Sequence, residues 1–379
     1  VTSTPTAPVR RVVRWRAVAL GRNPSSSTAA RTAARLSSRT SGDPLMTSDT
    51  SDFDTPARAA TSRIVGGRVT VAAWQGGAMT ASTPPRGWNS WDCFGTTVTE
   101  EEVLANAEVL ARELSPAGWD TVVVDIQWYE PVVQAGGYRP VSEPVLDAWG
   151  RQLPAPNRFP SAAGGAGFAP LAERVHALGL RFGVHLMRGI PRRAVELDLP
   201  VHGADGPTGS TARDVAVPED ACSWNPDNVG VDLDHPAGQA WYDGVVAQLA
   251  SWGVDYLKVD DLLFPFHERD LAAVALAIRR SGRDITLSTS PGTRVSLARL
   301  PVLREHATAW RVSDDLWDRW EDLHDQFQRA ARWAPHQRPG AWADLDMLPL
   351  GRIGIRAERG EDRQSRLTPD EQRSMVALW

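Results

Sequence analysis

The sequence contains only two cysteines, Cys93 and Cys222, among its 379 residues. Two are too few for a disulfide framework or for a metal site built from cysteines, and a single bridge between them is left open. An excess of basic residues is also missing, because 41 Lys and Arg stand against 46 Asp and Glu, for a net charge of −5. This balance offers no electrostatic footprint for nucleic acid or an anionic membrane, so the expected partner is a small neutral molecule or an oligosaccharide.

The first 82 residues lack hydrophobic periodicity, and they contain no apolar run long enough for a signal peptide core or a membrane span. They are rich in Ala, Ser, Thr and Arg. We expect a disordered or non-native extension over residues 1–82, with the true start left open by the internal Met46 and Met79. Because no signal peptide is visible, we expect a cytoplasmic protein, with secretion as the alternative if the start is wrongly assigned.

From residue 83 onward, short apolar runs alternate with helical patterns, which is typical of repeated βα units and a parallel sheet. The predicted strands span 87–91, 121–128, 181–187, 256–261, 285–290, 309–315 and 342–348. Predicted helices include one that begins at a capping box of Thr99 and Glu102, and others over 168–178, 236–252, 271–281 and 368–379. Long stretches at 129–165 and 189–234 are expected to build a pocket on the catalytic face.

Seven such strands predict a (β/α)8 TIM barrel over residues 83–379, whose eighth strand would follow the last helix. The sequence ends before that strand, so we expect an incomplete barrel with two open edges, which would need something to close it. A doubly wound sheet is the alternative. It is less favoured because no glycine-rich phosphate loop of standard spacing follows the first strand.

Acidic residues recur where the predicted strands end, and such ends converge on one face of a parallel barrel. They are Asp125, Asp260 with Asp261, Asp314 with Asp315, and Asp344 with Asp346. Two chemistries use such a cluster, namely glycoside cleavage by paired carboxylates and the binding of a divalent cation. Metal binding is less favoured because Lys258 and Arg311 bring positive charge to the same cluster, and we expect no metal and no cofactor.

Two of these carboxylates are predicted to have different roles. Lys258 and Asp260 lie two residues apart on one strand and so share a face, where the lysine keeps the carboxylate ionised, as a nucleophile requires. Asp315 is the candidate general acid, because burial and the charge of Asp260 would raise its pKa. Asp314 is expected to face the other way, although a shift of one residue in register would exchange the two.

Five segments resemble glycoside hydrolase family 27, the α-galactosidase clan. They are PPRGWNSWDCFG at 84–95, WGVDYLKVDDL at 252–262, WRVSDDLWDRWEDL at 310–323, PGAWADLDMLPLG at 339–351 and LTPDEQRSMVALW at 367–379. The resemblance implies a retaining (β/α)8 glycosidase that removes terminal α-galactosyl residues through a covalent intermediate. It also implies a C-terminal antiparallel β domain, which we do not expect to find within residues 83–379.

The resemblance assigns roles that agree with the assignments made from the residues. Asp260 matches the nucleophile and Asp315 the acid/base, and retention requires their carboxyl groups to lie roughly 5 to 5.5 Å apart. Among the substrate-binding residues, Lys258 and Arg311 match positions that bind sugar hydroxyls, and Trp91 matches an aromatic wall under the ring. Asp125 matches the first of two adjacent sugar-binding aspartates. Asp346 is placed in the same substrate-binding set, whereas Trp88 is expected to pack in the core.

Three departures from the family pattern concern the substrate. Ile126 stands where α-galactosidases carry the second aspartate, which is expected to bind the hydroxyl at C6, and the loss would cost about 1 to 3 kcal/mol. β-L-Arabinopyranose has the shape of galactose without C6, so β-L-arabinopyranosidase activity is the first alternative. His185 replaces a typical tyrosine and is expected to donate to a hydroxyl or a carboxylate. Ser290 lies near the position that accepts a 2-acetamido group in some members, which makes α-N-acetylgalactosaminidase activity a second alternative.

A different kind of hypothesis is that the chain is an inactive fragment or a sugar-binding relic. The missing eighth strand favours it. The presence of all the main catalytic positions favours an enzyme instead.

Overall fold

The computed structural model describes residues 81–379, except 140–141, 293 and 358–359. Almost all of the extension expected over residues 1–82 therefore lies outside the described residues. Both cysteines are free thiols, so the bridge that the sequence left open is not formed. No helix in the described part of the chain is both long and apolar enough to cross a membrane.

Seven parallel strands form the central sheet in the order in which the chain makes them. They are β1 (Gly87–Asn89), β2 (Thr121–Val124), β3 (Arg181–Met187), β9 (Tyr256–Asp260), β10 (Thr286–Thr289), β11 (Ala309–Arg311) and β12 (Trp342–Asp344). A doubly wound sheet would reverse its strand order at a switch point, and this sheet shows no reversal. The predicted barrel-type arrangement of seven parallel strands is therefore confirmed.

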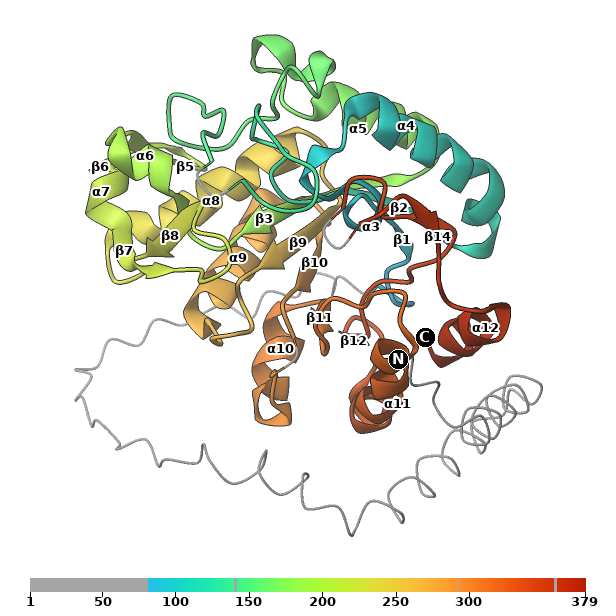
Figure 1. Cartoon of the computed structure of the whole chain (residues 1–379). Helices are drawn as coiled ribbons and strands as arrows, with labels where there is room; N and C mark the ends of the chain where they lie inside the picture. Colours follow the sequence, from blue (N-terminus) through green and yellow to red (C-terminus); the bar gives the residue numbers. More distant parts are fainter. Residues whose placement is uncertain (1–80, 140–141, 293, 358–359) are drawn as a thin grey trace, which may run out of the picture. The chain divides into compact units, whose positions relative to one another are not determined.

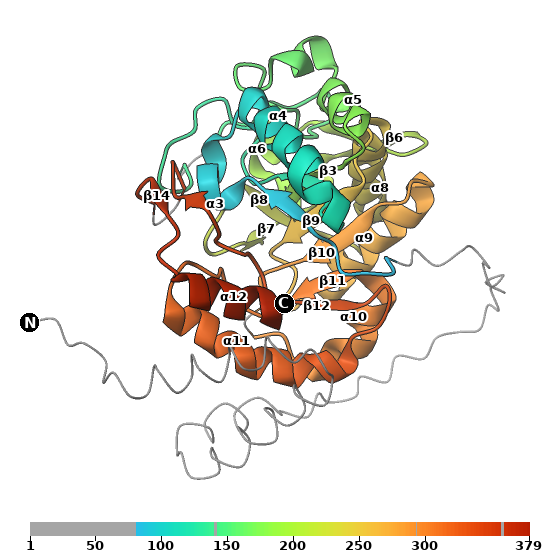
Figure 2. The same cartoon turned by 90° about the vertical axis from the view of Figure 1, so that its right-hand side faces the viewer.

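The helices follow one another around the outside of this curled sheet (Figures 1 and 2). The long ones are α4 (Glu100–Val109), α5 (Ala169–Ala177), α8 (Pro236–Ser251), α9 (Glu268–Ser281), α10 (Leu300–His306), α11 (Trp320–Trp333) and α12 (Pro369–Leu378). The capping box predicted at Thr99 and Glu102 is present at the start of α4. A second one, formed by Thr368 and Glu371, starts α12. The sequence-based prediction did not include α10 or α11.

Strand β3 has the predicted bounds, and the other six strands are shorter than predicted. In β9, Leu257 and Val259 are buried in the core, whereas Lys258 and Asp260 point to the opposite face. Residues 125–128 were expected to extend β2, but the chain turns after Val124 and Gln127 adopts a positive φ of 61°. Trp91, expected at the end of β1, instead starts the short helix α3 (Trp91–Phe94).

The stretch 189–234, for which no helix or strand was predicted, contains regular secondary structure. It holds a three-stranded antiparallel sheet and a hairpin, visible beside α8 in Figure 1. Its elements are β4 (Ile190–Pro191), α6 (Arg192–Glu196), β5 (Pro200–Gly203), β6 (Gly206–Thr211), α7 (Ala212–Val215), β7 (Ala216–Ala221) and β8 (Asn228–Val231). The strands were missed because they are short and carry no clean alternation of apolar and polar residues.

The segment after β12 returns to the beginning of the described chain. It contains the two-residue strands β13 (Arg352–Ile353) and β14 (Arg363–Gln364). The backbone amides of Gly354 and Arg356 donate to the carbonyls of Asp92 and Cys93 in α3. The guanidinium of Arg356 also forms an ion pair with Glu102 in α4 at 2.6 Å. These contacts hold α3, and with it Trp91, in place.

Candidate functional site

The strand register brings the predicted polar residues to one edge of the sheet. In the β3–β9 pairing, His185 lies beside Lys258, and Met187 lies beside Asp260. Val124 pairs with Val184, so Asp125, which follows β2 directly, lies next to His185. Carboxyl ends of parallel barrel strands carry the active sites of this architecture. The predicted carboxylates therefore do gather at the expected edge.

Asp260 is a buried carboxylate that three side chains hold in its ionised form. His185 Nε2 lies 2.9 Å from Asp260 Oδ2, and Ser290 Oγ donates to Oδ1. Lys258 Nζ lies 3.6 Å from Oδ2. Burial alone would raise the pKa of Asp260, but Lys258 and the hydrogen bond from His185 outweigh it and hold the pKa far below its usual range. An ionised carboxylate in this position is the state that nucleophilic attack needs.

His185 must carry its hydrogen on Nε2, because an ionised carboxylate can only accept. The histidine that replaces the family's typical tyrosine at position 185 therefore donates a hydrogen bond to the carboxylate of Asp260. Its Nδ1 is buried and has no hydrogen-bond partner in the described part of the chain. Ser290 serves the same carboxylate from the neighbouring strand. Its recognition of a 2-acetamido group stays a prediction.

Lys258 also fixes Asp125. Its Nζ donates to Asp125 Oδ2 at 2.9 Å, and Asn89 Nδ2 donates to the same oxygen at 2.7 Å. The backbone amide of Asp125 donates to Ser90 Oγ at 2.9 Å. Burial raises the pKa of Asp125, but the charges of Lys258 and His185 and the hydrogen bond from the backbone amide of Ile126 together lower it, and the net pKa lies below the usual value. Asp125 is thus a fixed, charged hydrogen-bond acceptor, held by Lys258 and by two residues of the GWNSW motif.

Arg311 at the end of β11 joins the other two carboxylates. Its Nη2 donates to Asp315 Oδ1 at 2.8 Å, and its Nε lies 3.2 Å from Asp346 Oδ1. Asp315 is the most accessible of these carboxylates, with 35% of its side chain exposed. Asp314 points to solvent and accepts a hydrogen bond from the backbone amide of Asp315 at 3.0 Å. The structure therefore agrees with the predicted register, in which Asp315 and not its neighbour faces the site.

Asp346 retains a proton near neutral pH. Burial and the nearby charges of Asp315 and Asp344 raise the pKa of Asp346 to about 7, although Arg311 lowers it. One guanidinium cannot neutralise two carboxylates at once, so this corner of the site holds a proton beside Asp315. This arrangement could not be predicted from the sequence, because it depends on the ion pairs of Arg311.

Asp92 is a further carboxyl of the site that the sequence-based prediction did not include. It follows Trp91 in α3, and its Oδ1 is buried without a hydrogen-bond partner among the described residues. Burial, followed by the charges of Asp346 and Asp315, raises its pKa well above the usual value. A lone acid after a tryptophan carries no recognisable pattern, and only the fold shows which groups surround it.

Ile126 lies in an apolar cluster at the same edge. The cluster, which we call the Ile126 cluster, consists of Trp91, Ile126, Met187, Cys222, Trp317 and Ala357. Ile126 is 1% exposed and Trp91 3% exposed. Asp125, the neighbour of Ile126, is charged and fixed by Lys258 and Asn89, so a polar and an apolar side chain follow each other at this edge of the sheet. Trp88, by contrast, packs edge-on against Phe94 in the core, as predicted.

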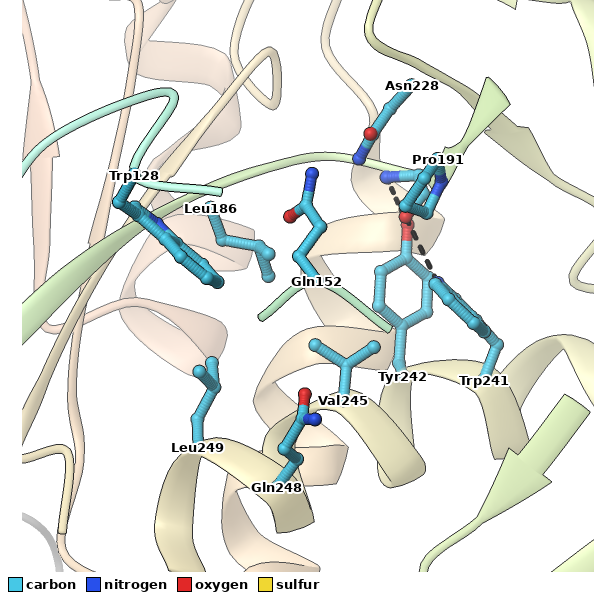
Figure 3. A pocket seen from close by; sticks show the side chains of 11 residues that line it. Trp128, Gln152, Leu186, Pro191, Asn228, Trp241, Tyr242, Val245, Gln248 and Leu249 are labelled. Carbon is cyan, nitrogen blue, oxygen red and sulfur yellow. Dashed lines mark hydrogen bonds between the residues drawn. The ribbon is translucent and has the colours of Figure 1, made fainter. Parts of the chain in front are cut away.

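A different enclosed space lies between β3 and α8 (Figure 3). Leu186, the neighbour of His185 on the opposite face of β3, lines it together with Trp241 and Tyr242 of α8. None of the carboxylates described above lines this space. It is a gap in the packing between sheet and helix, and the site lies on the other face of the strand. Within residues 81–379 as described, no cluster of His, Cys, Asp and Glu has the geometry to hold a metal ion.

The chain is similar to proteins that cleave α-galactosides and related sugars. A model of the alpha galactosidase A family matches residues 230–368. A solved GH27 β-L-arabinopyranosidase from Geobacillus stearothermophilus, in complex with arabinose, is 49% identical with a TM-score of 0.76, and the match covers 79% of this chain and 70% of that one.

Two curated relatives are more distant. Alpha-galactosidase 3 of Arabidopsis thaliana is 26% identical over 306 residues, which cover 79% of this chain and 53% of the relative. Alpha-N-acetylgalactosaminidase of Gallus gallus is 27% identical over 319 residues, which cover 79% of this chain and 62% of the relative. The chain thus spans about half the length of the first curated relatives it matches.

Proposed function

This chain belongs to glycoside hydrolase family 27, and we propose that it removes terminal β-L-arabinopyranosyl residues with retention of configuration at the anomeric carbon. The observation that carries the choice of sugar is the burial of Ile126 in the Ile126 cluster. A hydroxyl at C6 of galactose would meet apolar atoms there instead of the second aspartate that the family pattern leads us to expect. β-L-Arabinopyranose has no C6 and leaves no polar group unsatisfied.

The size of this preference follows from the cost of an unpaired hydroxyl. Leaving a buried hydroxyl without a partner costs about 1 to 3 kcal/mol. Since 1.4 kcal/mol corresponds to a factor of ten, arabinosides should be favoured over galactosides by about five- to one-hundred-fold in kcat/KM. The β-L-arabinopyranosidase from Geobacillus stearothermophilus, 49% identical to this chain, supports the same choice.

The first half of the proposed reaction forms a glycosyl-enzyme. A carboxylate oxygen of Asp260 attacks the anomeric carbon while the bond from that carbon to the leaving-group oxygen breaks. Asp315 gives its proton to that oxygen, so the leaving group departs as a neutral alcohol. Asp260 is suited to attack because Lys258 and His185 keep it ionised. The partial exposure of Asp315 suits contact with a departing group.

The second half releases the sugar. A water molecule attacks the anomeric carbon, Asp315 takes the proton of that water, and the ester bond to Asp260 breaks. The hydrogen bonds from His185 and Ser290 stabilise the carboxylate of Asp260 as it leaves the anomeric carbon. In both steps Asp125 accepts hydrogen bonds from sugar hydroxyls, a role supported by its ion pair with Lys258.

α-Galactosides are the second candidate substrate. The pair of Asp125 and Lys258 and the ion pairs of Arg311 would serve both sugars, which differ only at C6. α-N-Acetylgalactosaminides are less favoured, because the hydroxyl of Ser290 is engaged with Asp260.

The test is to compare kcat/KM for the p-nitrophenyl β-L-arabinopyranoside, α-D-galactopyranoside and α-N-acetylgalactosaminide on one preparation. We expect the arabinoside to be hydrolysed best and the galactoside more slowly. Hydrolysis of the galactoside with no turnover of the arabinoside would contradict the proposal.

A further inference from the structure

Three aromatic rings form a continuous row from the buried site to the surface. Trp91 stacks on Tyr138 with ring centroids 5.4 Å apart and an interplanar angle of 23°. Tyr138 in turn contacts Trp224 at 5.5 Å and 42°. The rings come from α3, from the stretch after β2 and from the turn before β8. Three distant segments of the chain thus meet in one aromatic array.

The inner end of the row adjoins the proposed reaction centre. Trp91 belongs to the Ile126 cluster, as does Cys222, which lies two residues before Trp224. The thiol of Cys222 hydrogen-bonds to the carboxylate of Asp261, the residue after Asp260. The segment that carries Trp224 is therefore anchored next to the proposed nucleophile.

The outer end of the row is exposed. Trp224 is 38% exposed, against 3% for Trp91, and it is the only tryptophan in the described part of the chain that counts among the exposed large hydrophobic side chains. An indole ring is costly to leave in water, and flat aromatic rings are typical of surfaces that bind another ring. Packing alone does not account for its position, because a core role would bury it.

Phe264, in the turn after β9, is a second exposed aromatic residue, at 48%. The guanidinium of Arg294 lies 4.7 Å from the centroid of its ring and covers it. Among the described residues, no ring pair joins Phe264 to the row of Trp91, Tyr138 and Trp224. It is therefore a matched control for the loss of an exposed aromatic side chain after a catalytic strand.

We propose that Trp224 is the platform of a subsite for the leaving group, on which the next sugar ring of an oligosaccharide stacks during glycosyl transfer to Asp260. This inference rests on the proposed function. Tyr138 lies against the indole of Trp224, and Trp91 stacks on Tyr138 at the end of the row that belongs to the Ile126 cluster. The subsite would favour glycosides whose leaving group contains a ring over those whose leaving group does not.

The test compares Trp224→Ala with the wild type on three glycosides of whichever sugar the wild type hydrolyses. The leaving groups are a second sugar, p-nitrophenol and fluoride. The ratio of variant to wild-type kcat/KM is taken for each substrate, so intrinsic differences between leaving groups cancel. For the two ring-bearing substrates we expect a fall of about two- to tenfold, the value of one aromatic stacking contact. For the fluoride, which has no ring to stack, we expect no change, and that activity also reports a folded enzyme.

Trp224→Phe should recover part of the loss, and Phe264→Ala should leave all three ratios near one. A fall with the disaccharide alone would support the sugar subsite, and a fall with both rings would support it as well. Equal ratios on all three substrates would overturn the subsite while leaving the proposed function standing. A wild type inactive on every glycoside would overturn both.

Discussion

The hydroxyl of Ser290 donates a hydrogen bond to Oδ1 of Asp260, while His185 Nε2 holds the other oxygen at 2.9 Å. Both oxygens of the proposed nucleophile are thus fixed by side chains, one from β3 and one from the residue that follows β10. The family resemblance suggested that Ser290 touches the substituent at C2 of the sugar. The structure gives it a contact that every substrate would share.

Ser290→Ala removes that contact and should lower kcat for all substrates. A hydrogen bond to a charged group contributes about 1.5 to 3 kcal/mol, so the expected fall is about ten- to one-hundred-fold. Thr289→Val, which removes the hydroxyl of the preceding residue, is the matched control and should have a small effect. A loss confined to the N-acetylated substrate would show that Ser290 reads the sugar and does not position Asp260.

Ile126→Asp should raise the activity on α-galactosides relative to β-L-arabinopyranosides. The new carboxylate would accept a hydrogen bond from the C6 hydroxyl, and the expected change in the ratio of the two kcat/KM values is about five- to one-hundred-fold. Ile126→Asn introduces a side chain with the shape of aspartate but without its charge. Comparing the two variants therefore distinguishes the effect of a hydrogen bond from the effect of the charge. Because the Ile126 cluster is apolar, the thermal midpoint of both variants should fall. If a folded variant kept the wild-type ratio of the two kcat/KM values, Ile126 would have a role in packing alone.

Asp315→Ala should lower kcat/KM for p-nitrophenyl glycosides by about 10²- to 10⁴-fold, the usual contribution of a general acid. Dinitrophenolate is a stable anion that can leave without protonation. The rate of glycosyl-enzyme formation from a dinitrophenyl glycoside should therefore fall far less. Asp314→Ala is the control, because Asp314 points to solvent. If Asp314→Ala were the damaging variant, the assignment of the two neighbouring aspartates would have to be exchanged.

Asp346 should make stability depend on pH between about pH 4 and 7. Its pKa in the folded protein is about 7, above the value of about 3.9 for an unfolded aspartate. The folded state therefore keeps a proton that the unfolded state has lost. The stability that this proton contributes is complete below about pH 4 and is lost as the pH rises through 7.

The check is the urea midpoint at pH 5 and at pH 7.5 for the wild type and Asp346→Asn. The asparagine of the variant cannot titrate. From pH 5 to pH 7.5, the urea midpoint of the variant should therefore fall less than that of the wild type, or rise more. Asp125 and Asp260 have lowered pKa values and do not titrate in this range in either state. Identical pH dependence in both proteins would contradict the protonation of Asp346.

The sequence predicted the sheet and the position of the charged residues, because both follow from periodicity along the chain. Alternation placed Lys258 and Asp260 on one face, and the parallel register brought Asp125 and Arg311 to the same edge. The strands of 189–234 escaped prediction because they are two to six residues long. A short strand without alternation has no signal above that of a loop.

The raised pKa values of two carboxyl groups in the site could not be predicted from the sequence either. Asp92 and Asp346 lie more than 250 positions apart, and their raised pKa values arise from burial and from charges that only the folded chain brings together. The same holds for Trp224. Nothing in CSWNP indicates that its ring continues a row that starts at Trp91.

The most direct test of the account is the proton NMR spectrum of the sugar first released from p-nitrophenyl β-L-arabinopyranoside, recorded before mutarotation. Double displacement at Asp260 predicts that β-L-arabinopyranose appears first and that the α anomer grows in only later. Initial release of the α anomer would contradict the retaining mechanism. No release, under conditions where the α-galactoside is hydrolysed, would contradict the proposed substrate.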